Sequence, residues 1–137
     1  MPTMRLHRVI LPVDDLEVAA RFYSTLFGRP GVRISPGRHY FQCGDVVVAV
    51  YSPRADGDTR DPRPNFDHIY VAVDDLDEMY RRAVRTGVLS TETGDGQLPM
   101  GAIAVRPWGE RSFYLKDPFG NPVCFIDSNT VFTGNVG

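Results

Sequence analysis

The sequence is poor in the features that mark several large classes of protein. Its 137 residues contain two cysteines, Cys43 and Cys124, too few for the disulfide framework of a small secreted domain. No apolar run approaches the ~18 residues that span a bilayer. Fifteen basic residues against 17 acidic ones give a formal charge of −2, so there is no basic surplus to neutralise nucleic-acid phosphates. Nucleic acid and membrane are therefore not expected partners.

The N-terminal segment also lacks the marks of a signal peptide. Five apolar residues, 9–13, precede Asp14, and no small-residue cleavage site follows them. We therefore expect a cytoplasmic protein with reduced thiols. The length fits one domain over residues 1–137, and a composition of 42% apolar and 23% charged residues excludes a disordered chain.

A repeat lies inside the chain. Val13-Asp14-Asp15-Leu16 returns sixty positions later as Val73-Asp74-Asp75-Leu76. Each copy follows a short apolar stretch and precedes apolar residues at three- and four-residue spacing, which predicts a helix over 16–27 and another over 76–84. The aspartates predict N-caps, in capping boxes that pair Asp14 with Glu17 and Asp75 with Glu78. Gly28 and Gly87 are expected to end the two helices.

Short strand patterns follow each helix, at 32–35, 39–42 and 46–51 and again at 103–106, 112–116 and 123–126. A hairpin turn is expected at 43–45 and a tight turn at 117–121, where Gly120 is free to take a positive φ. Residues 52–64 carry three prolines and six charges, which indicates a linker.

These elements predict an α+β fold made of two tandem β-α-β-β-β modules, module 1 at about 4–52 and module 2 at about 65–127. The helix of each module covers one face of its sheet and leaves the other face bare. Burial of that apolar face drives the two modules to associate. The concave sheet face is then the expected place for a ligand cavity.

Several stretches resemble the vicinal oxygen chelate superfamily, which includes glyoxalase I, bleomycin-resistance proteins and extradiol dioxygenases. The stretches that carry the resemblance are residues 8–16 with Phe22-Tyr23 and 26–28, then 68–76, and finally 117–123. The resemblance covers roughly residues 4–127. It implies the fold predicted above but no single activity, because the superfamily holds lyases, isomerases, dioxygenases, transferases and drug binders.

The resemblance also implies where a metal ion would be bound. The ligand positions of metal-dependent members fall on Arg8, near Ala49, and on His68 and Cys124. Only His68 is a typical ligand, because a guanidinium has no lone pair to donate and one His with one Cys falls short of a catalytic zinc site. His7 is one residue out of register and is expected on the opposite face of its strand. We therefore expect no metal and no other cofactor.

The candidate ligand-binding residues are Arg8, Tyr51, His68, Tyr70, Trp108 and Cys124. Arg8 would favour a carboxylate, phosphate or enolate, or else pair with a neighbouring acid. His68 is a candidate acid/base group or a hydrogen-bonded cavity wall. Trp108 lies in a stretch, 106–111, that resembles the family's Trp-Gly-x-Arg and would line the cavity or fill the core. Cys124 is either a small buried filler or a thiolate activated by a nearby cation.

Three functions remain open from the sequence. The first hypothesis is a metal-free protein that binds a small organic molecule of anionic or aromatic character, either sequestering it or acting on it by acid–base chemistry. The second is a metal-dependent lyase, isomerase or dioxygenase whose ligands come from unexpected positions such as His39, Glu110 or Cys124. The third is a non-catalytic scaffold that pairs with a partner chain. A homodimer is expected from the resemblance, with the cavity inside one chain or across the dimer interface.

Overall fold

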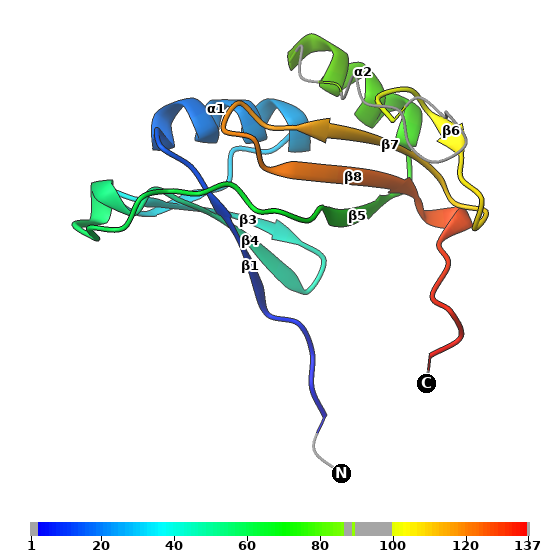
Figure 1. The fold of residues 1–137 in the computed structure, drawn as a ribbon, viewed down its shortest axis with the longest axis horizontal. Helices are drawn as coiled ribbons and strands as arrows, with labels where there is room; N and C mark the ends of the chain where they lie inside the picture. Colours follow the sequence, from blue (N-terminus) through cyan, green and yellow to red (C-terminus); the bar gives the residue numbers. More distant parts are fainter. Residues whose placement is uncertain (1–2, 87–88, 90–99, 137) are drawn as a thin grey trace. The chain divides into compact units, whose positions relative to one another are not determined.

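The computed structural model describes residues 3–86, 89 and 100–136. The chain divides into two compact units, Met1–Asn65 and Phe66–Gly137. Each unit contains one main helix and a four-stranded mixed sheet (Figure 1). The predicted α+β fold of two tandem modules is confirmed, and each unit is described below by itself.

The first unit runs through β1 (Arg8–Pro12), α1 (Leu16–Phe27), β2 (Val32–Ser35), β3 (Arg38–Cys43), β4 (Val46–Tyr51) and the 3-10 turn η1 (Arg54–Asp56). Its strand order is β1-β4-β3-β2. β1 pairs with β4 in parallel, and the other pairs are antiparallel. The two strands β3 and β4 turn at residues 44 and 45, where Gly44 takes a φ of 58°.

The start of α1 differs in detail from the prediction. Asp15 is the N-cap, and its carboxylate accepts a hydrogen bond from the backbone N–H of Val18. The predicted capping box of Asp14 with Glu17 is therefore wrong by one residue, and the Glu17 carboxylate instead contacts Arg33 at 2.6 Å. The end is as predicted, since Gly28 closes the helix in the left-handed conformation with a φ of 72°.

Strand alternation gives the first sheet two different faces. Leu11 of β1 and Val13, just after β1, point toward α1 and are buried, and Val48 and Val50 of β4 point the same way and are also buried. The opposite face carries Arg8, Ile10 and Pro12 from β1 beside Val47, Ala49 and Tyr51 from β4. This opposite face is free of α1 and carries the pocket described below.

The second unit runs through β5 (Ile69–Val73), α2 (Leu76–Thr86), β6 (Ala104–Val105), β7 (Arg111–Lys116), β8 (Pro122–Asp127) and the 3-10 turn η3 (Ser128–Thr130). Its strand order, β5-β8-β7-β6, repeats that of the first unit. Here too the strand that comes first in the chain, β5, pairs in parallel with the strand that comes last, β8. The helix α2 packs on β7 and β8 through buried Leu76, Met79 and Ala83. Asp75 caps it by accepting the N–H of Glu78 at 3.0 Å. Gly87 lies outside the described residues.

The strand predicted over 103–106 is shorter in the structure, where only Ala104 and Val105 pair with β7. Arg106 begins the turn that leads into β7. Its carbonyl oxygen accepts the backbone N–H of Gly109, and its own backbone N–H donates to the carbonyl oxygen of Glu110. Its side chain turns inward and is buried.

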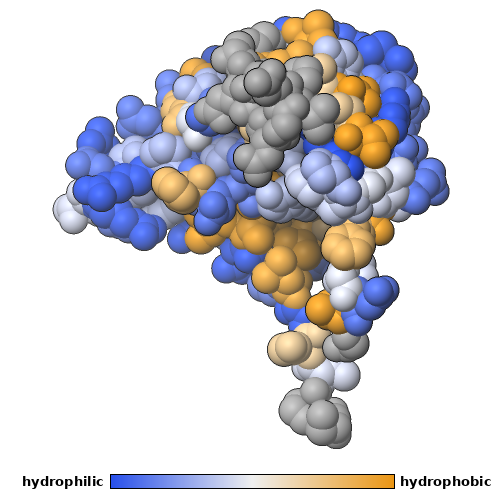
Figure 2. Space-filling view, turned by 45° about the vertical axis from the view of Figure 1, so that its right-hand side comes forward, coloured by the Kyte–Doolittle hydropathy of each residue, from blue (hydrophilic) through white to orange (hydrophobic). Residues whose placement is uncertain are grey.

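Neither α1 nor α2, at 12 and 11 residues, has the length and hydropathy that a bilayer crossing requires, and the same is true of every helix in the described part of the chain. The segment before β1 has exposed apolar side chains, including Met4 and Leu6. Apolar surface is visible along this arm at the bottom of Figure 2.

Candidate functional site

The two units provide an internal alignment of the four positions where the resemblance implies metal ligands. Tyr70 of β5 pairs with Cys124 of β8. The repeat of sixty residues makes Ile10 the counterpart of Tyr70, and Ile10 pairs with Ala49 of β4. Ala49 is therefore the counterpart of Cys124, which fixes the one ligand position that the sequence left uncertain.

The first unit supplies no metal ligand at its two positions. Arg8 is exposed at the start of β1, with its guanidinium carbon 5.5 Å from the ring centre of Tyr40 and a nitrogen 3.4 Å from His7 Nε2. Ala49 is fully buried and has no donor in its side chain. A guanidinium repels a divalent cation, so this half does not fit one.

The second unit supplies one imidazole and one sulfur. His68 precedes β5, and its ring stands edge-on to Tyr114 with 5.0 Å between ring centres. Cys124 is fully buried, and burial raises the pKa of its thiol from 9.0 to about 11. At neutral pH and without a metal the sulfur is therefore a protonated thiol, not an activated nucleophile. The buried filler interpretation of Cys124 fits this environment.

The alternative ligands His39 and Glu110 are held in other contacts. The His39 ring nitrogen Nε2 lies 2.8 Å from the carbonyl oxygen of Pro30, on the side of the first sheet that faces α1. The Glu110 carboxylate accepts the indole N–H of Trp108 at 2.6 Å and the backbone N–H of Phe132 at 2.9 Å. Within the described residues no three His, Cys, Asp or Glu side chains come together as a metal site would require. The donor set of the described residues does not fit the metal ion that the resemblance implies.

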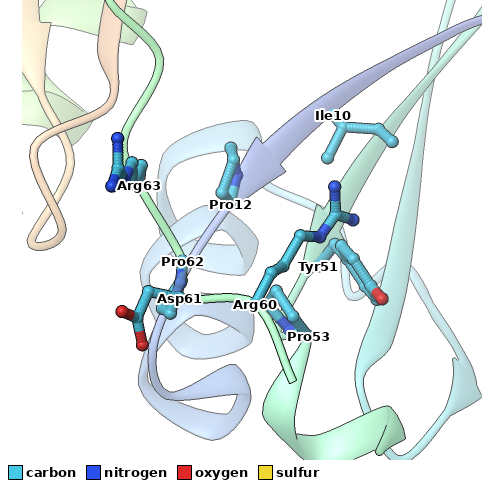
Figure 3. A pocket seen from close by; sticks show the side chains of 8 residues that line it. All are labelled: Ile10, Pro12, Tyr51, Pro53, Arg60, Asp61, Pro62 and Arg63. Carbon is cyan, nitrogen blue, oxygen red and sulfur yellow. The ribbon is translucent and has the colours of Figure 1, made fainter. Parts of the chain in front are cut away.

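A cavity of about 540 Å³ lies in the first unit, on the sheet face that is free of α1. Figure 3 shows how β1, the end of β4 and the segment 60–63 surround it. Its lining residues are Ile10, Pro12, Tyr51, Pro53, Arg60, Asp61, Pro62 and Arg63. The volume falls in the range of sites for small organic molecules.

Segment 60–63 belongs to the stretch predicted as a linker. The side-chain amide of Asn65 donates to the backbone carbonyl of Ile10 at 2.9 Å and so ties this stretch to β1. At the other end, Asp58 accepts the Tyr51 hydroxyl at 3.2 Å and the backbone N–H of Arg60 at 3.0 Å. These bonds hold the segment over the end of β4, where it forms one wall of the pocket.

Tyr51 is the centre of a charged cluster. Its ring faces the guanidinium of Arg38 at 4.2 Å and that of Arg60 at 5.4 Å. The hydrogen bonds from the Arg60 N–H and from the Tyr51 hydroxyl keep the pKa of Asp58 below its ordinary value. Asp58 is therefore an anion at neutral pH, and it holds Arg60 beside the Tyr51 ring through an ion pair of 3.2 Å.

The corresponding face of the second unit has a different character. Tyr114 and Cys124 are buried beneath it, and desolvation raises the pKa of Tyr114 to about 12. Arg106 lies with its guanidinium carbon 4.9 Å from the Tyr114 ring centre and donates to Ser112 Oγ at 3.0 Å. Tyr70 is 60% exposed on β5. This face combines aromatic rings with a buried cation, and the sequence analysis did not single out Arg106.

The six candidate residues are thus divided between the units. Tyr51 lines the pocket of the first unit, whereas Arg8 lies on the same sheet face outside the lining. His68, Tyr70 and Cys124 gather on one face of the second unit, where Tyr70 and Cys124 are paired. Trp108 lies in the turn between β6 and β7 and is about half exposed.

Sequence reasoning missed Arg60 and Arg63, because a segment rich in proline and charge reads as a connection between modules. The signal that would have found them is the stretch Arg60-Asp61-Pro62-Arg63-Pro64, in which two prolines restrict the backbone of a segment that carries two arginines.

Comparison with known proteins gives one family and many structures of the same fold. A model of the Glyoxalase/Bleomycin resistance protein/Dioxygenase superfamily matches residues 5–125. No curated protein sequence matches the chain.

Three solved structures illustrate the similarity. A glyoxalase-related enzyme from Fulvimarina pelagi has a TM-score of 0.71 at 22% identity, over 98% of this chain and 96% of its own. Lactoylglutathione lyase from Agrobacterium tumefaciens has a TM-score of 0.67 at 24% identity, over 93% and 96% of the two chains. A bleomycin-binding protein complexed with bleomycin has a TM-score of 0.65 at 26% identity, over 91% and 98%.

The family match spans nearly the whole chain and both units, and the resemblance seen in the sequence is confirmed. The chain belongs to the glyoxalase/bleomycin resistance protein/dioxygenase superfamily.

Proposed function

We propose that this chain binds a small organic molecule in the pocket of its first unit and does so without a metal ion. The observation that carries the proposal is the cavity of about 540 Å³ lined by Tyr51, two arginines and a set of apolar side chains. A mostly apolar cleft with a few placed polar groups is the usual form of a small-molecule site.

The family comparison supports binding as the type of function. The bleomycin-binding protein described above, which is complexed with bleomycin, is 26% identical to this chain and shares its fold. The fold alone does not select between binders and enzymes, because the superfamily contains both. The pocket and the donor set therefore favour a binder.

The donor set supports metal independence. The four positions that hold a metal in the family are Arg8, Ala49, His68 and Cys124 here. One imidazole remains, whereas a catalytic metal site takes about three protein ligands. If the bound molecule is also transformed, His68 is our candidate acid/base group, since an imidazole titrates near neutral pH.

The proposal includes sequestration by a homodimer in the cytoplasm. The exposed apolar side chains of Met4 and Leu6, before β1, support pairing with a second chain because association would bury them. Cys43 and Cys124 are both free thiols, which is compatible with a reducing compartment.

A variant that fills the pocket tests the proposed site. Ile10→Trp adds an indole to a lining residue that is 39% exposed, and it should abolish binding of fragments detected by saturation-transfer NMR on the wild-type chain. The matched control is Ile34→Trp, on β2 of the same sheet and outside the lining, at a residue that is 52% exposed. Circular dichroism verifies that both variants fold.

Binding that survives Ile10→Trp would place the ligand elsewhere and contradict the proposed site. Fragments that bind only after a divalent metal is added would contradict the metal-free part of the proposal.

A further inference from the structure

We infer that the ligand of this pocket is an organic monocarboxylate, with an apolar body held against β1 and a carboxylate held by Arg63, while Arg60 is a second cation of the lining. This inference rests on the proposed function, because it names the chemical class of the molecule that the pocket takes. It follows from which charges in the lining are already satisfied and which are not.

Arg63 is the cation available to a ligand. It lines the pocket and is exposed, and none of the described residues forms a hydrogen bond or ion pair with its guanidinium. A planar guanidinium offers two parallel N–H donors, and a carboxylate matches this geometry with its two oxygens. Arg63 therefore presents an unused binding group for an anion at the edge of an apolar cavity.

Arg60 is a second hydrogen-bond donor of the lining, and its existing ion pair is weak. Its ion pair with Asp58 joins side chains that are 64% and 36% exposed, and solvent screening makes such a pair weak. Figure 3 shows the Arg60 side chain crossing in front of Tyr51 and reaching toward Ile10. It can donate to a ligand there while the Tyr51 ring continues to support the guanidinium.

Asp61 does not cancel these cations, because its carboxylate is bound to another group. It forms an ion pair with Arg54, which is not part of the lining. Figure 3 shows the Asp61 carboxylate directed away from Arg60 and Ile10, to the side of the segment on which Arg63 lies. Of the two arginines in the lining, Arg60 already has an ion pair with Asp58, so one cation without such a pair among the described residues remains, which suits one negative charge better than the two of a phosphate monoester.

The remaining lining is apolar and rigid. Ile10 and Pro12 come from β1, and Pro53 and Pro62 come from the segments that enclose the cavity. None of these side chains offers a hydrogen bond, so they contribute by contact with an apolar or aromatic body. The ligand therefore combines such a body with a single carboxylate.

Isothermal titration calorimetry on the full chain with three matched pairs tests the inference. The acids are 2-naphthoate, biphenyl-4-carboxylate and decanoate, and each is compared with its neutral amide. We expect at least one acid to bind about tenfold more tightly than its amide, since the charge-assisted hydrogen bonds are lost in the amide. Arg63→Gln should remove this preference, and Arg60→Gln should reduce it.

Arg21→Gln is the control for the change in net charge, because Arg21 lies on α1 and is exposed. It should leave the affinities within about twofold of wild type, as a surface charge outside the site does. The dianion 2-naphthyl phosphate is the third arm, and it should bind no more tightly than 2-naphthoate.

The outcomes separate this inference from the proposed function. Equal affinities for acid and amide that are unchanged by Arg63→Gln overturn the carboxylate and leave a pocket that binds neutral molecules. Tighter binding of the phosphate, or binding of amides but of no acid, overturns the ligand class in the same way. If no compound of the series binds in a manner that Ile10→Trp abolishes, the inference and the proposed pocket are both contradicted.

Discussion

Asp117→Ala should lower the free energy of unfolding of the second unit by about 3–5 kcal/mol, because it leaves buried donors without their acceptor. Asp117 is 4% exposed in the turn between β7 and β8. Its Oδ1 accepts the backbone N–H groups of Phe119 and Asn121 at 2.9 and 2.8 Å. Its Oδ2 accepts the side-chain amide of Asn121, also at 2.8 Å. The loss can be measured by guanidinium unfolding followed through the fluorescence of Trp108, the single tryptophan, which lies in the same unit.

Asp117→Asn is the conservative control for this substitution. It keeps one oxygen acceptor in the same volume and should cost about 1–3 kcal/mol, less than the alanine. A free energy of unfolding for Asp117→Ala within ~0.5 kcal/mol of wild type would mean that the turn does not depend on this carboxylate.

Phe41→Ala should destabilise the first unit by about 3–5 kcal/mol, the usual cost of deleting a buried aromatic ring. Phe41 is 1% exposed on β3, on the sheet face toward α1. Its ring centre lies 5.3 Å from that of Phe27 and 5.1 Å from that of His39. The substitution therefore leaves a cavity beneath the helix. Denaturant unfolding followed by far-ultraviolet circular dichroism measures the effect.

Phe41→Leu retains most of the volume and should cost no more than about 1.5 kcal/mol, and Val32→Ala at an exposed position of β2 should stay within ~0.5 kcal/mol of wild type. A loss for Phe41→Ala no larger than that for Val32→Ala would contradict the packing of α1 on this sheet.

The fold was predictable from the sequence because both modules repeat the same local signals. The bounds of α1 and of strands β2 and β4 agree with the sequence analysis. Errors occurred where tertiary contacts decide between neighbours. Asp15 rather than Asp14 caps α1. Either aspartate satisfies the sequence pattern, and the path of the backbone into the helix decides which of the two is the N-cap. Arg106 likewise lies outside the predicted strand, because its side chain turns inward and donates hydrogen bonds to Ser112 Oγ and to the carbonyl oxygen of Ala102.

The site was predictable only where it lies on a regular strand. Tyr51, at the end of β4, was one of the candidate ligand-binding residues, and it lines the pocket. Arg60 and Arg63 lie in an irregular segment whose path depends on single hydrogen bonds from Asn65 and to Asp58, and no periodicity encodes such bonds. The sequence therefore indicated the sheet face that carries the pocket but missed the two arginines that line it.

Metal content per chain tests the central claim most directly. The protein is purified without a chelator, incubated with Ni²⁺, Zn²⁺, Mn²⁺ and Fe²⁺ in turn, passed through gel filtration and analysed by inductively coupled plasma mass spectrometry. With Arg8 and Ala49 in one unit and only one imidazole and one buried thiol in the other, fewer ligands than a catalytic metal site takes, we expect less than about 0.1 equivalent of any metal per chain. Retention near one equivalent, lost in His68→Ala, would contradict the account.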